Sequence, residues 1–459
     1  MVVLLAVGAT VQLAEAQVPP QVRNILFIVS DDLKASALGC YGNAICRTPH
    51  LDELAKRSVV FDRSYCQGTV CGPSRTSFMF SRYQGQGSVT LAEHFRNQGH
   101  YTARVGKIFH MKVPGDIIAG TNGQDVAASW TERFNAPGFE AHTRGLYACL
   151  NLNDFSRRKE GRQSTAMPHR MFVSVQSDGD GTNQPDHRAA GKAIQLLNEL
   201  QHEPFFLAVG FVRPHYPMVT PKSYFDDHPW QQIPLPVAVQ NDLADIPKAG
   251  IPKRTSAENG IDRYPDNQRR MWQAYYASVS FMDQQVGRLL AELDRLGLRD
   301  STAIVFTSDH GYHLGEHAFW QKNDLHEEVI RVPLMMSVPG YQPGRSDSIV
   351  ELVDLFPTLT DLAGLPLPDG LHGVSLKPVL QDHSTMVKDG ALAFARGTCW
   401  RTDRWAYMSY SQGEELYDMK NDPDQFHNLA EDPQHAATLT RLRSRLKQQN
   451  QRFRPAHRH

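Results

Sequence analysis

A cysteine and an arginine stand together at the start of a predicted helix. In Cys71-Gly72-Pro73-Ser74-Arg75, the glycine and proline favour a helix start, because the N–H that proline lacks would be unpaired in a first turn anyway. Cys71 would lie at the positive end of the helix dipole, and Arg75, about one turn further, would offer a planar guanidinium to the same spot. The segment could therefore hold an anion beside a nucleophile. A buried cysteine before an ordinary helix is an equally good interpretation of these residues alone.

Charged side chains follow four apolar segments of the chain at the point where each segment ends. They are Asp31 and Asp32 after 24–29, Lys107 and His110 after 101–105, His215 after 205–211, and Asp309 and His310 after 302–307. Apolar runs of this kind are typical of strands buried in a parallel sheet. Helices are predicted between them, so the chain favours a doubly wound, mostly parallel α/β sheet sandwiched by helices. Such sheets bind ligands outside the carboxyl ends of their strands, where all four groups would meet.

Together these side chains could act on a tetrahedral oxyanion. The carboxylates of Asp31, Asp32 and Asp309 are hard oxygen ligands that suit Ca²⁺ or Mg²⁺. His310 would be a less usual neutral ligand for so hard an ion. A bound anion would be surrounded by charge-assisted donors from Arg75, Lys107, His215 and Lys322. His110 and His215 can transfer protons near neutral pH. A structural role is the simpler interpretation of each residue taken singly, and their coincidence at equivalent strand ends is what favours a site.

Composition excludes some functions and indicates others. The 459 residues have a formal net charge of -1 and no basic stripe, which argues against nucleic-acid binding. An apolar run at 1–10, followed by Ala14-Glu15-Ala16, predicts a signal peptide over 1–16, although the usual basic start is missing and a cytosolic arm is the alternative. No later stretch is apolar enough for stable membrane insertion. The spacing of Cys40 and Cys46 permits a disulfide without establishing one.

The character of the sequence changes near residue 390. Short alternating runs at 391–395, 405–410 and 415–418 predict a small antiparallel sheet, and a helix is predicted over 436–451. We therefore expect a catalytic α/β domain over 17–385 and a C-terminal α+β subdomain over 386–459. Irregular loops are predicted over 111–186 and 217–264, a loop over 315–322, and a helix interrupted by Pro357 over 350–362.

These motifs resemble those of the sulfatases of the alkaline-phosphatase superfamily. The resemblance covers about 24–380, and more loosely 417–429. It rests on Ser30-Asp31-Asp32, Gly39-Cys40-Tyr41-Gly42, Cys71-Gly72-Pro73-Ser74-Arg75, Gly106-Lys107, Arg213-Pro214-His215, and Ser308-Asp309-His310-Gly311 with Gly315-Glu316-His317. Within the family the chain is most similar to the iduronate-2-sulfatase branch. Two residues separate Lys107 from His110, and His310 stands where many sulfatases have asparagine.

The resemblance implies a sulfuric ester hydrolase that is exported (periplasmic or secreted, or lysosomal in a eukaryote) and acts on a sulfated sugar or oligosaccharide. It implies that a formylglycine-generating enzyme oxidises Cys71 to formylglycine, whose hydrate attacks sulfur. The implied ligands of a Ca²⁺ ion, with Mg²⁺ less favoured, are Asp31, Asp32, Cys71, Asp309 and His310. The implied catalytic residues are Cys71, Arg75, Lys107, His110, His215 and Lys322. His215 or Lys322 would protonate the leaving sugar oxygen, and His110, beside Lys107, would accept a proton.

One segment departs from the family pattern. Where the family usually has Leu-Thr-Gly-Arg, this chain has Met79-Phe80-Ser81-Arg82, within the region that assists recognition by the formylglycine-generating enzyme. Conversion of Cys71 is still expected, with lower efficiency or by a differently tuned enzyme. Two alternatives remain open: a phosphodiesterase or phosphonate hydrolase on the same scaffold, and a catalytically silent carbohydrate-binding relative that keeps the Cys71 thiol.

Overall fold

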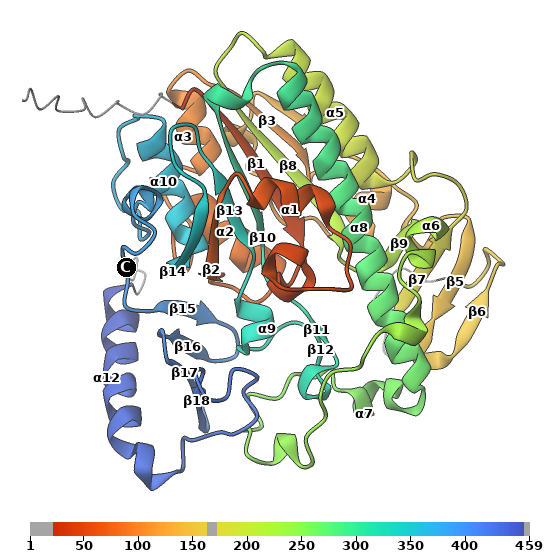
Figure 1. The fold of residues 1–459 in the computed structure, drawn as a ribbon, viewed down its shortest axis with the longest axis vertical. Helices are drawn as coiled ribbons and strands as arrows, with labels where there is room; N and C mark the ends of the chain where they lie inside the picture. The colour runs from red at the N-terminus through yellow and green to blue at the C-terminus, as the bar shows by residue number, and fades with distance from the viewer. Residues whose placement is uncertain (1–21, 163–171, 454–459) are drawn as a thin grey trace, which may run out of the picture.

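The computed structural model describes residues 22–162 and 172–453, so the predicted signal peptide lies outside the described residues. Its centre is an eight-stranded sheet (Figure 1). The strand order is β14 (Gly344–Glu351), β2 (Val59–Tyr65), β13 (Leu334–Ser337), β10 (Thr302–Ser308), β1 (Asn24–Asp31), β8 (Phe205–Pro214), β3 (Tyr101–Gly106), β4 (Glu132–Phe134). β13 is antiparallel to both of its neighbours, and the other pairings in this sheet are parallel. The predicted mostly parallel sheet is confirmed.

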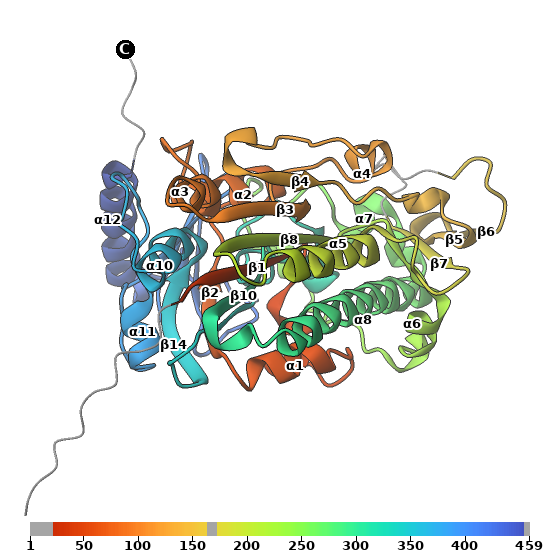
Figure 2. The same cartoon turned by 90° about the horizontal axis from the view of Figure 1, so that it is seen from above.

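Alternating side chains of the central strand pack into two separate cores. Leu26 and Ile28 face helices α1 (Pro49–Ala55), α5 (Pro185–Glu199) and α8 (Pro265–Arg295). Ile25, Phe27 and Val29 face the opposite way, toward α2 (Cys71–Phe80), α3 (Leu91–Asn97) and α10 (Leu355–Leu362). The sheet therefore lies between two helical layers (Figure 2). Burial on both faces explains why β1, β8 and β10 are apolar without interruption.

A second, smaller sheet lies beyond the carboxyl-end edge of the central sheet. The strands β15 (Ala391–Phe394), β16 (Thr398–Arg401), β17 (Trp405–Ser409) and β18 (Glu414–Asp418) pair antiparallel in this order. α12 (Ala436–Arg452) inserts Leu439, Leu442 and Leu446 against Trp400 and Tyr407 of this sheet. The predicted small antiparallel sheet and helix are confirmed, with β16 as an additional strand. The proposed division at residue 386 stays a prediction.

The irregular stretches contain more structure than their sequences indicate. Residues 111–186 and 217–264 include α4 (Gly115–Ala119), β5 (Gly145–Cys149), β6 (Asp154–Ser156), β7 (Val173–Ser177), β9 (Met218–Pro221), α6 (Lys222–Asp226) and α7 (Ser256–Asn259). The prediction of purely irregular loops was wrong. β7 and β9 pair in parallel although a long segment separates them in sequence, and such pairing leaves no local pattern.

Two smaller predictions also need correction. The helix predicted over 350–362 begins later: Val350 and Glu351 end β14, and a short 3-10 helix covers Leu352–Asp354. α10 begins at Leu355, so Pro357 lies in its first turn and interrupts nothing. The predicted loop at 315–322 is bounded by a two-stranded pair, β11 (His313–Leu314) with β12 (Trp320–Gln321). All six cysteines are free, so Cys40 and Cys46 form no disulfide. None of the helices in the described ranges has the length and apolarity needed to cross a bilayer.

Candidate active site

Three adjacent strands bring the predicted groups together. β1 pairs with β10 up to Ser30 and Ser308, and with β8 up to Asp31 and Pro214. The residues that follow these points in the chain therefore leave the sheet side by side. Asp32 has a positive φ of 64°, which turns the chain sharply at the end of β1. The prediction that these strand ends share one place is confirmed.

Buried ion pairs join the carboxylates to the basic groups. The Arg75 Nε donates to Asp309 Oδ2 at 2.8 Å, and its Nη2 donates to Asp31 Oδ1 at 3.1 Å. The Lys107 ammonium pairs with the other oxygen of Asp31. Burial alone would raise the pKa of Asp31, but Lys107 and Arg75 together hold it well below its usual value. Asp31 is therefore ionised and acts as the negative hub between two cations.

Cys71 lies at the first turn of α2, facing this network. Its Sγ is 3.2 Å from Lys322 Nζ, 3.4 Å from His310 Nε2 and 3.9 Å from Asp32 Oδ1. Burial and the Asp31 carboxylate raise the pKa of the Cys71 thiol well above its usual value. A thiol of this kind stays protonated at neutral pH and is a poor nucleophile. The position therefore favours the role of a precursor over that of a catalytic thiolate.

Four of the predicted metal ligands form one compact group. The ligand atoms of Asp31, Asp32, Cys71 and His310 all lie within 4.8 Å of one another. Asp309 flanks the group, because its Oδ1 accepts from the Asp32 backbone N–H at 3.1 Å. Asp32 Oδ2 is buried without a hydrogen-bond partner in the described structure, and burial with the neighbouring Asp31 raises the Asp32 pKa. An orphaned carboxylate oxygen in an oxygen-rich set fits a hard divalent cation.

The two predicted proton-transfer histidines differ in exposure. His215 is buried, with Nε2 3.7 Å from Asp32 Oδ2 and Nδ1 hydrogen-bonded to the Tyr216 carbonyl. His110 is half-buried and lies next to Gly72 at the rim of the group. Burial and the nearby Lys322 lower the pKa of His215, and burial with Lys107 lowers the pKa of His110 to about 4. Both imidazoles are neutral at pH 7 and can accept a proton.

Several supporting residues were given no role from the sequence, although Ser74 and Arg213 lie within motifs of the family resemblance. The Tyr275 hydroxyl, from the middle of α8, donates to the Asp32 carbonyl at 2.7 Å and fixes the turn after β1. Ser74 donates through Oγ to the Asp309 carbonyl, which ties α2 to the end of β10. Arg213 pairs with the buried Glu140 at 3.1 Å and holds the segment that carries His215. A tyrosine or serine inside a helix carries no local mark of such a role.

The departure at residues 79–82 has a structural compensation. Ser81 ends α2 in the left-handed region, with φ 50° and ψ 48°, where glycine is the usual residue. Its hydroxyl donates to the Val353 carbonyl at 2.7 Å and accepts from the Gly373 N–H at 3.1 Å. These bonds offset the backbone strain, which costs about 1 kcal/mol for a residue with a Cβ.

Comparison with known proteins decides the family. The family model described as "Sulfatase" matches residues 23–365, and the model of the C-terminal region of N-sulphoglucosamine sulphohydrolase matches residues 315–452. The chain belongs to the sulfatase family. As a sulfatase it is a sulfuric ester hydrolase. The second match covers the small C-terminal sheet and α12, so the central sheet and the C-terminal sheet are each covered by one of these models.

Named relatives agree with this assignment, and solved structures share the fold. The chain is 32% identical to mouse iduronate 2-sulfatase over 89% of its length and 76% of that protein. It is 35% identical to the human iduronate 2-sulfatase over 75% of its length and 70% of that protein. The fold matches the phosphonate monoester hydrolase of Agrobacterium radiobacter with a TM-score of 0.77 at 22% identity, covering 94% of this chain and 96% of the hydrolase. A structure described as a 2-O GAG sulfatase matches with a TM-score of 0.69 at 21% identity, covering 94% and 92%.

Proposed function

We propose that this sulfatase removes sulfate from a sulfated carbohydrate of the iduronate-2-sulfate type, using a hydrated formylglycine made from Cys71. The proposal rests mainly on the surroundings of Cys71, whose buried thiol stays protonated. The carboxylates of the metal-ligand group lie near it, and so do the basic side chains of Arg75, Lys107 and Lys322. The names of the relatives that share most of the chain, two iduronate 2-sulfatases, support the substrate class.

A bound Ca²⁺ ion would supply positive charge next to the sulfuryl oxygens, and the hydrated formylglycine would supply the attacking hydroxyl group. Asp31, Asp32, residue 71, Asp309 and His310 would hold the ion. The entering sulfate ester adds negative charge to a site in which three carboxylates already balance Arg75, Lys107 and Lys322, so a divalent ion is needed to offset it.

The chain's own residues divide the remaining work. Arg75 and Lys107, both fully buried, are fixed by Asp31 and orient the sulfate without rearrangement during the reaction. The ammonium of Lys322, whose pKa stays well above its usual value because the nearby Asp32 outweighs burial, is a permanent donor toward the leaving oxygen. Neutral His110 accepts the proton that must leave the second hydroxyl group before the aldehyde re-forms.

A cavity beside Cys71 has room for a sugar. Its volume is about 540 Å³, and its lining includes Gly72, Gln124, Asn323 and Arg396. Gly72 precedes Pro73 in α2 and Asn323 follows Lys322, so the cavity adjoins the proposed sulfate position from two elements. Arg396, contributed by the small antiparallel sheet, places a positive charge where an acidic sugar would lie.

The proposal also covers the maturation of Cys71 and the location of the protein. We infer export through the predicted signal peptide to the periplasm or the cell exterior, or to the lysosome in a eukaryote. We also infer that a formylglycine-generating enzyme is a transient partner during synthesis. The native hydrolase would thus carry its aldehyde before it meets substrate.

Two measurements on protein from its native host test the function. Mass spectrometry of the peptide that contains Cys71 should show the mass of formylglycine in place of the thiol. Turnover of nitrophenyl sulfate should exceed that of nitrophenyl phosphate at matched concentration. A fully unmodified thiol would support the silent carbohydrate-binding alternative, and faster phosphate turnover would support a phosphoesterase.

The acid that protonates the leaving oxygen can be assigned by leaving-group dependence. Lys322→Ala should slow hydrolysis of sugar sulfates far more than hydrolysis of activated aryl sulfates, because only the poor leaving group needs the proton. His215→Ala is the matched comparison. If His215 is the acid instead, its variant will show the selective loss and Lys322→Ala will lose both activities equally.

A further inference from the structure

A second cluster of metal-binding side chains lies outside the active site. His313 of β11, Asp324 and His326 are buried, and their ligand atoms lie within 4.8 Å of one another. His313 Nε2 is 3.0 Å and His326 Nδ1 is 3.3 Å from the same oxygen, Asp324 Oδ1. Metal–nitrogen and metal–oxygen bonds of about 2.0–2.2 Å in a tetrahedral site place ligand atoms about 3.3–3.6 Å apart. Both distances to Asp324 Oδ1 are therefore close to that spacing, and the third lies within 4.8 Å.

A carboxylate faces the far side of each imidazole ring. His326 Nε2 is 3.2 Å from Glu415 Oε2, and His313 Nδ1 is 3.8 Å from Glu316 Oε2. The outer carboxylates are themselves held, since Glu415 Oε2 accepts from the Tyr417 hydroxyl at 2.6 Å and Glu316 pairs with Lys34. Metal-bound histidines characteristically give their second ring nitrogen to a carboxylate, which fixes the tautomer and the ring orientation. Both histidines here have that environment.

The cluster lacks a permanent positive charge. Within the described residues, no lysine or arginine lies at ion-pair distance from the buried carboxylates of Asp324 and Glu415. Asp324 Oδ2, Glu415 Oε1 and both ring nitrogens of His326 lack a hydrogen bond of normal geometry. A divalent ion at the cluster would give some of these atoms a partner and add positive charge beside the buried carboxylates.

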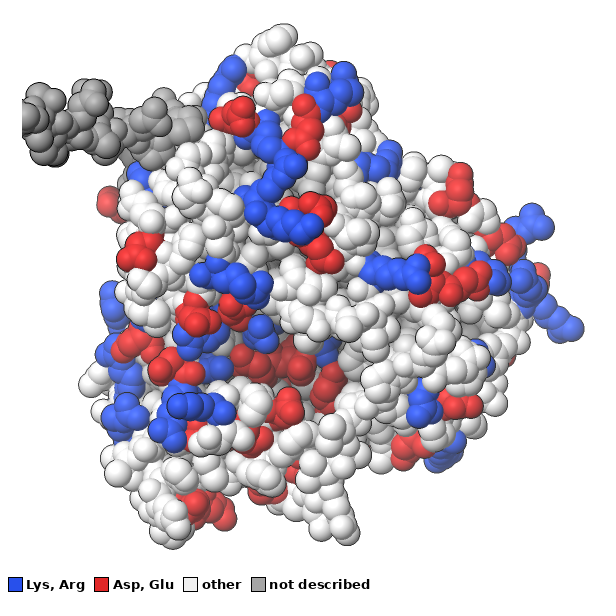
Figure 3. Space-filling model, in the orientation of Figure 1, with Lys and Arg blue, Asp and Glu red and all other residues white. Residues whose placement is uncertain are grey.

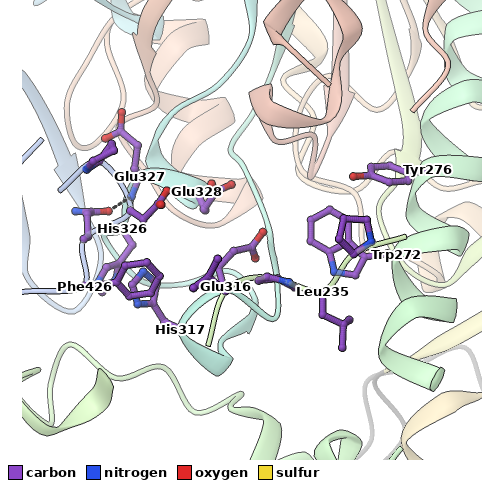
Figure 4. Close-up of a pocket in the computed structure, with 15 residues that line it drawn as sticks. Leu235, Trp272, Tyr276, Glu316, His317, His326, Glu327, Glu328 and Phe426 are labelled. Atoms are coloured by element: carbon purple, nitrogen blue, oxygen red, sulfur yellow. Dashed lines mark hydrogen bonds between the residues drawn. The ribbon is translucent and has the colours of Figure 1, made fainter. Parts of the chain in front are cut away.

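A pocket provides an entry path that avoids the active site. Its lining includes His326, Glu316, Glu327 and Glu328, opposite Trp272 and Leu235 (Figure 4). Acidic side chains gather on the face of the molecule near α9 (Glu327–Ile330), between the central and C-terminal sheets (Figure 3). The pocket thus gives the cluster a path to solvent that is lined by carboxylates, each of which pairs with Lys34 or Arg401.

We propose that His313, Asp324 and His326 bind a zinc-class divalent transition-metal ion through Nε2, a carboxylate oxygen and Nδ1. Two imidazole nitrogens with one carboxylate favour such an ion over Ca²⁺ or Mg²⁺. The ion would connect three parts of the molecule. It would join β11 to the segment of Asp324 and His326, which begins two residues after Lys322. Its outer partner Glu415 lies on β18 of the C-terminal sheet.

Cobalt(II) is a direct probe, because its visible absorption is intense when nitrogen and oxygen ligands surround it tetrahedrally. Purified full-length protein is stripped with a chelator, resupplied with Ca²⁺ and titrated with CoCl₂. The same titration is run on Cys71→Ala, which removes the thiol as an alternative ligand. We expect one bound Co²⁺ in both proteins and its displacement by ZnCl₂. Absence of bound Co²⁺, or binding that disappears in Cys71→Ala, would overturn the proposal.

Variants locate the ion. Asp324→Asn and His326→Gln should weaken Co²⁺ binding at least 100-fold, and Glu415→Gln should weaken it about 10- to 100-fold as an outer partner. His317→Gln is the matched control, because His317 lies on the same loop with its ring centroid 5.3 Å from that of His326 but pairs with Asp242. It should bind Co²⁺ as the parent does. Unchanged binding in Asp324→Asn and His326→Gln would refute the assignment.

A stability measurement covers variants that fold poorly. Zn²⁺ should raise the melting temperature of the stripped parent protein and leave that of Asp324→Asn unchanged. Equal shifts in both proteins would place the ion elsewhere.

Discussion

At the residue scale, the chemistry of position 71 is governed by its neighbours. The helix start by itself would favour a thiolate, since free N–H groups face the sulfur. Burial and the negative hub of Asp31 outweigh that effect and keep the thiol protonated. The side chain is thus unsuited to catalysis in the form in which it is translated, although it lies within reach of His310 and Lys322.

Asp309→Asn should reduce sulfate-ester hydrolysis by about 10²- to 10³-fold, since one preorganised group in an active site is commonly worth that much. The amide keeps the size of the side chain but cannot balance Arg75, whose Nε it faces at 2.8 Å. Activity on nitrophenyl sulfate is measured beside circular dichroism. Asp226→Asn, an exposed site on α6 paired with Lys222, is the control. Activity equal to that of the parent would rule out a role for Asp309 in the site.

Arg396→Gln should raise the KM for a sulfated uronate about fivefold and leave kcat unchanged. The guanidinium is exposed in the cavity beside Gly72, and loss of one solvent-accessible charge pair costs about 1 kcal/mol. A neutral sulfated sugar serves as the internal control, with an unchanged KM. An equal rise in the KM for both sugars would mean that Arg396 does not bind the carboxylate of the uronate.

At the element scale, the sequence predicted the strands that carry the site, and it failed where pairing is non-local. β1, β8 and β10 are almost continuously apolar in their middle because both faces are covered, so their ends and the charged residues there could be placed without a structure. β7 and β9 were missed because each is short and is stabilised by a partner distant in sequence. Tyr275 was missed because its role depends on where α8 crosses the end of β1.

The end of α2 joins the C-terminal helix through a pH-sensitive contact. The Nη1 of Arg82, just after α2, lies 2.9 Å from His372 Nε2, and the His372 ring centroid is 4.9 Å from that of Phe453. Burial and the charges of Arg82 and Arg452 lower the pKa of His372 to about 4. The imidazole is therefore neutral in the folded protein at pH values where it is already protonated in the unfolded chain.

The free energy of unfolding should consequently fall as the pH drops from about 7 to 4. A shift of the His372 pKa from about 6.5 in the unfolded chain to about 4 in the folded protein would contribute about 3 kcal/mol if the side chain were fully buried. Because the side chain is partly exposed, we expect about 1–2 kcal/mol. Urea unfolding is followed at each pH for the parent and for His372→Gln. The free energy of unfolding of His372→Gln should depend less steeply on pH between about 7 and 4, because this variant lacks the imidazole. Parallel pH curves for the two proteins would contradict the prediction.

At the scale of the whole molecule, buried charges join the two sheets. Arg401 of β16 donates to Glu327 at the start of α9 at 2.9 Å, and the Tyr65 hydroxyl of β2 donates to the same carboxylate at 3.0 Å. The contact crosses the boundary predicted at residue 386. The small sheet is therefore anchored to the segment that follows Lys322 as well as to α12.

Arg401→Met should lower the free energy of unfolding by about 3 kcal/mol, because it leaves the carboxylate of Glu327 in a mostly buried place without its cation. Glu327→Gln combined with Arg401→Met should recover part of the loss. Calorimetry checks both, and a single transition is expected because the two parts share this contact. Two separated transitions in the parent protein would show that they unfold independently.

The burial of α2 also sets an order of events during synthesis. Cys71, Arg75, Phe78 and Met79 are at most 4% exposed once the chain is folded. An enzyme that needs to grip this segment can reach it only while the helix is uncovered. A molecule that folds with the thiol intact is then sealed in that form. Under the proposed conversion to formylglycine, adding the generating enzyme to folded protein with an intact thiol should not restore activity.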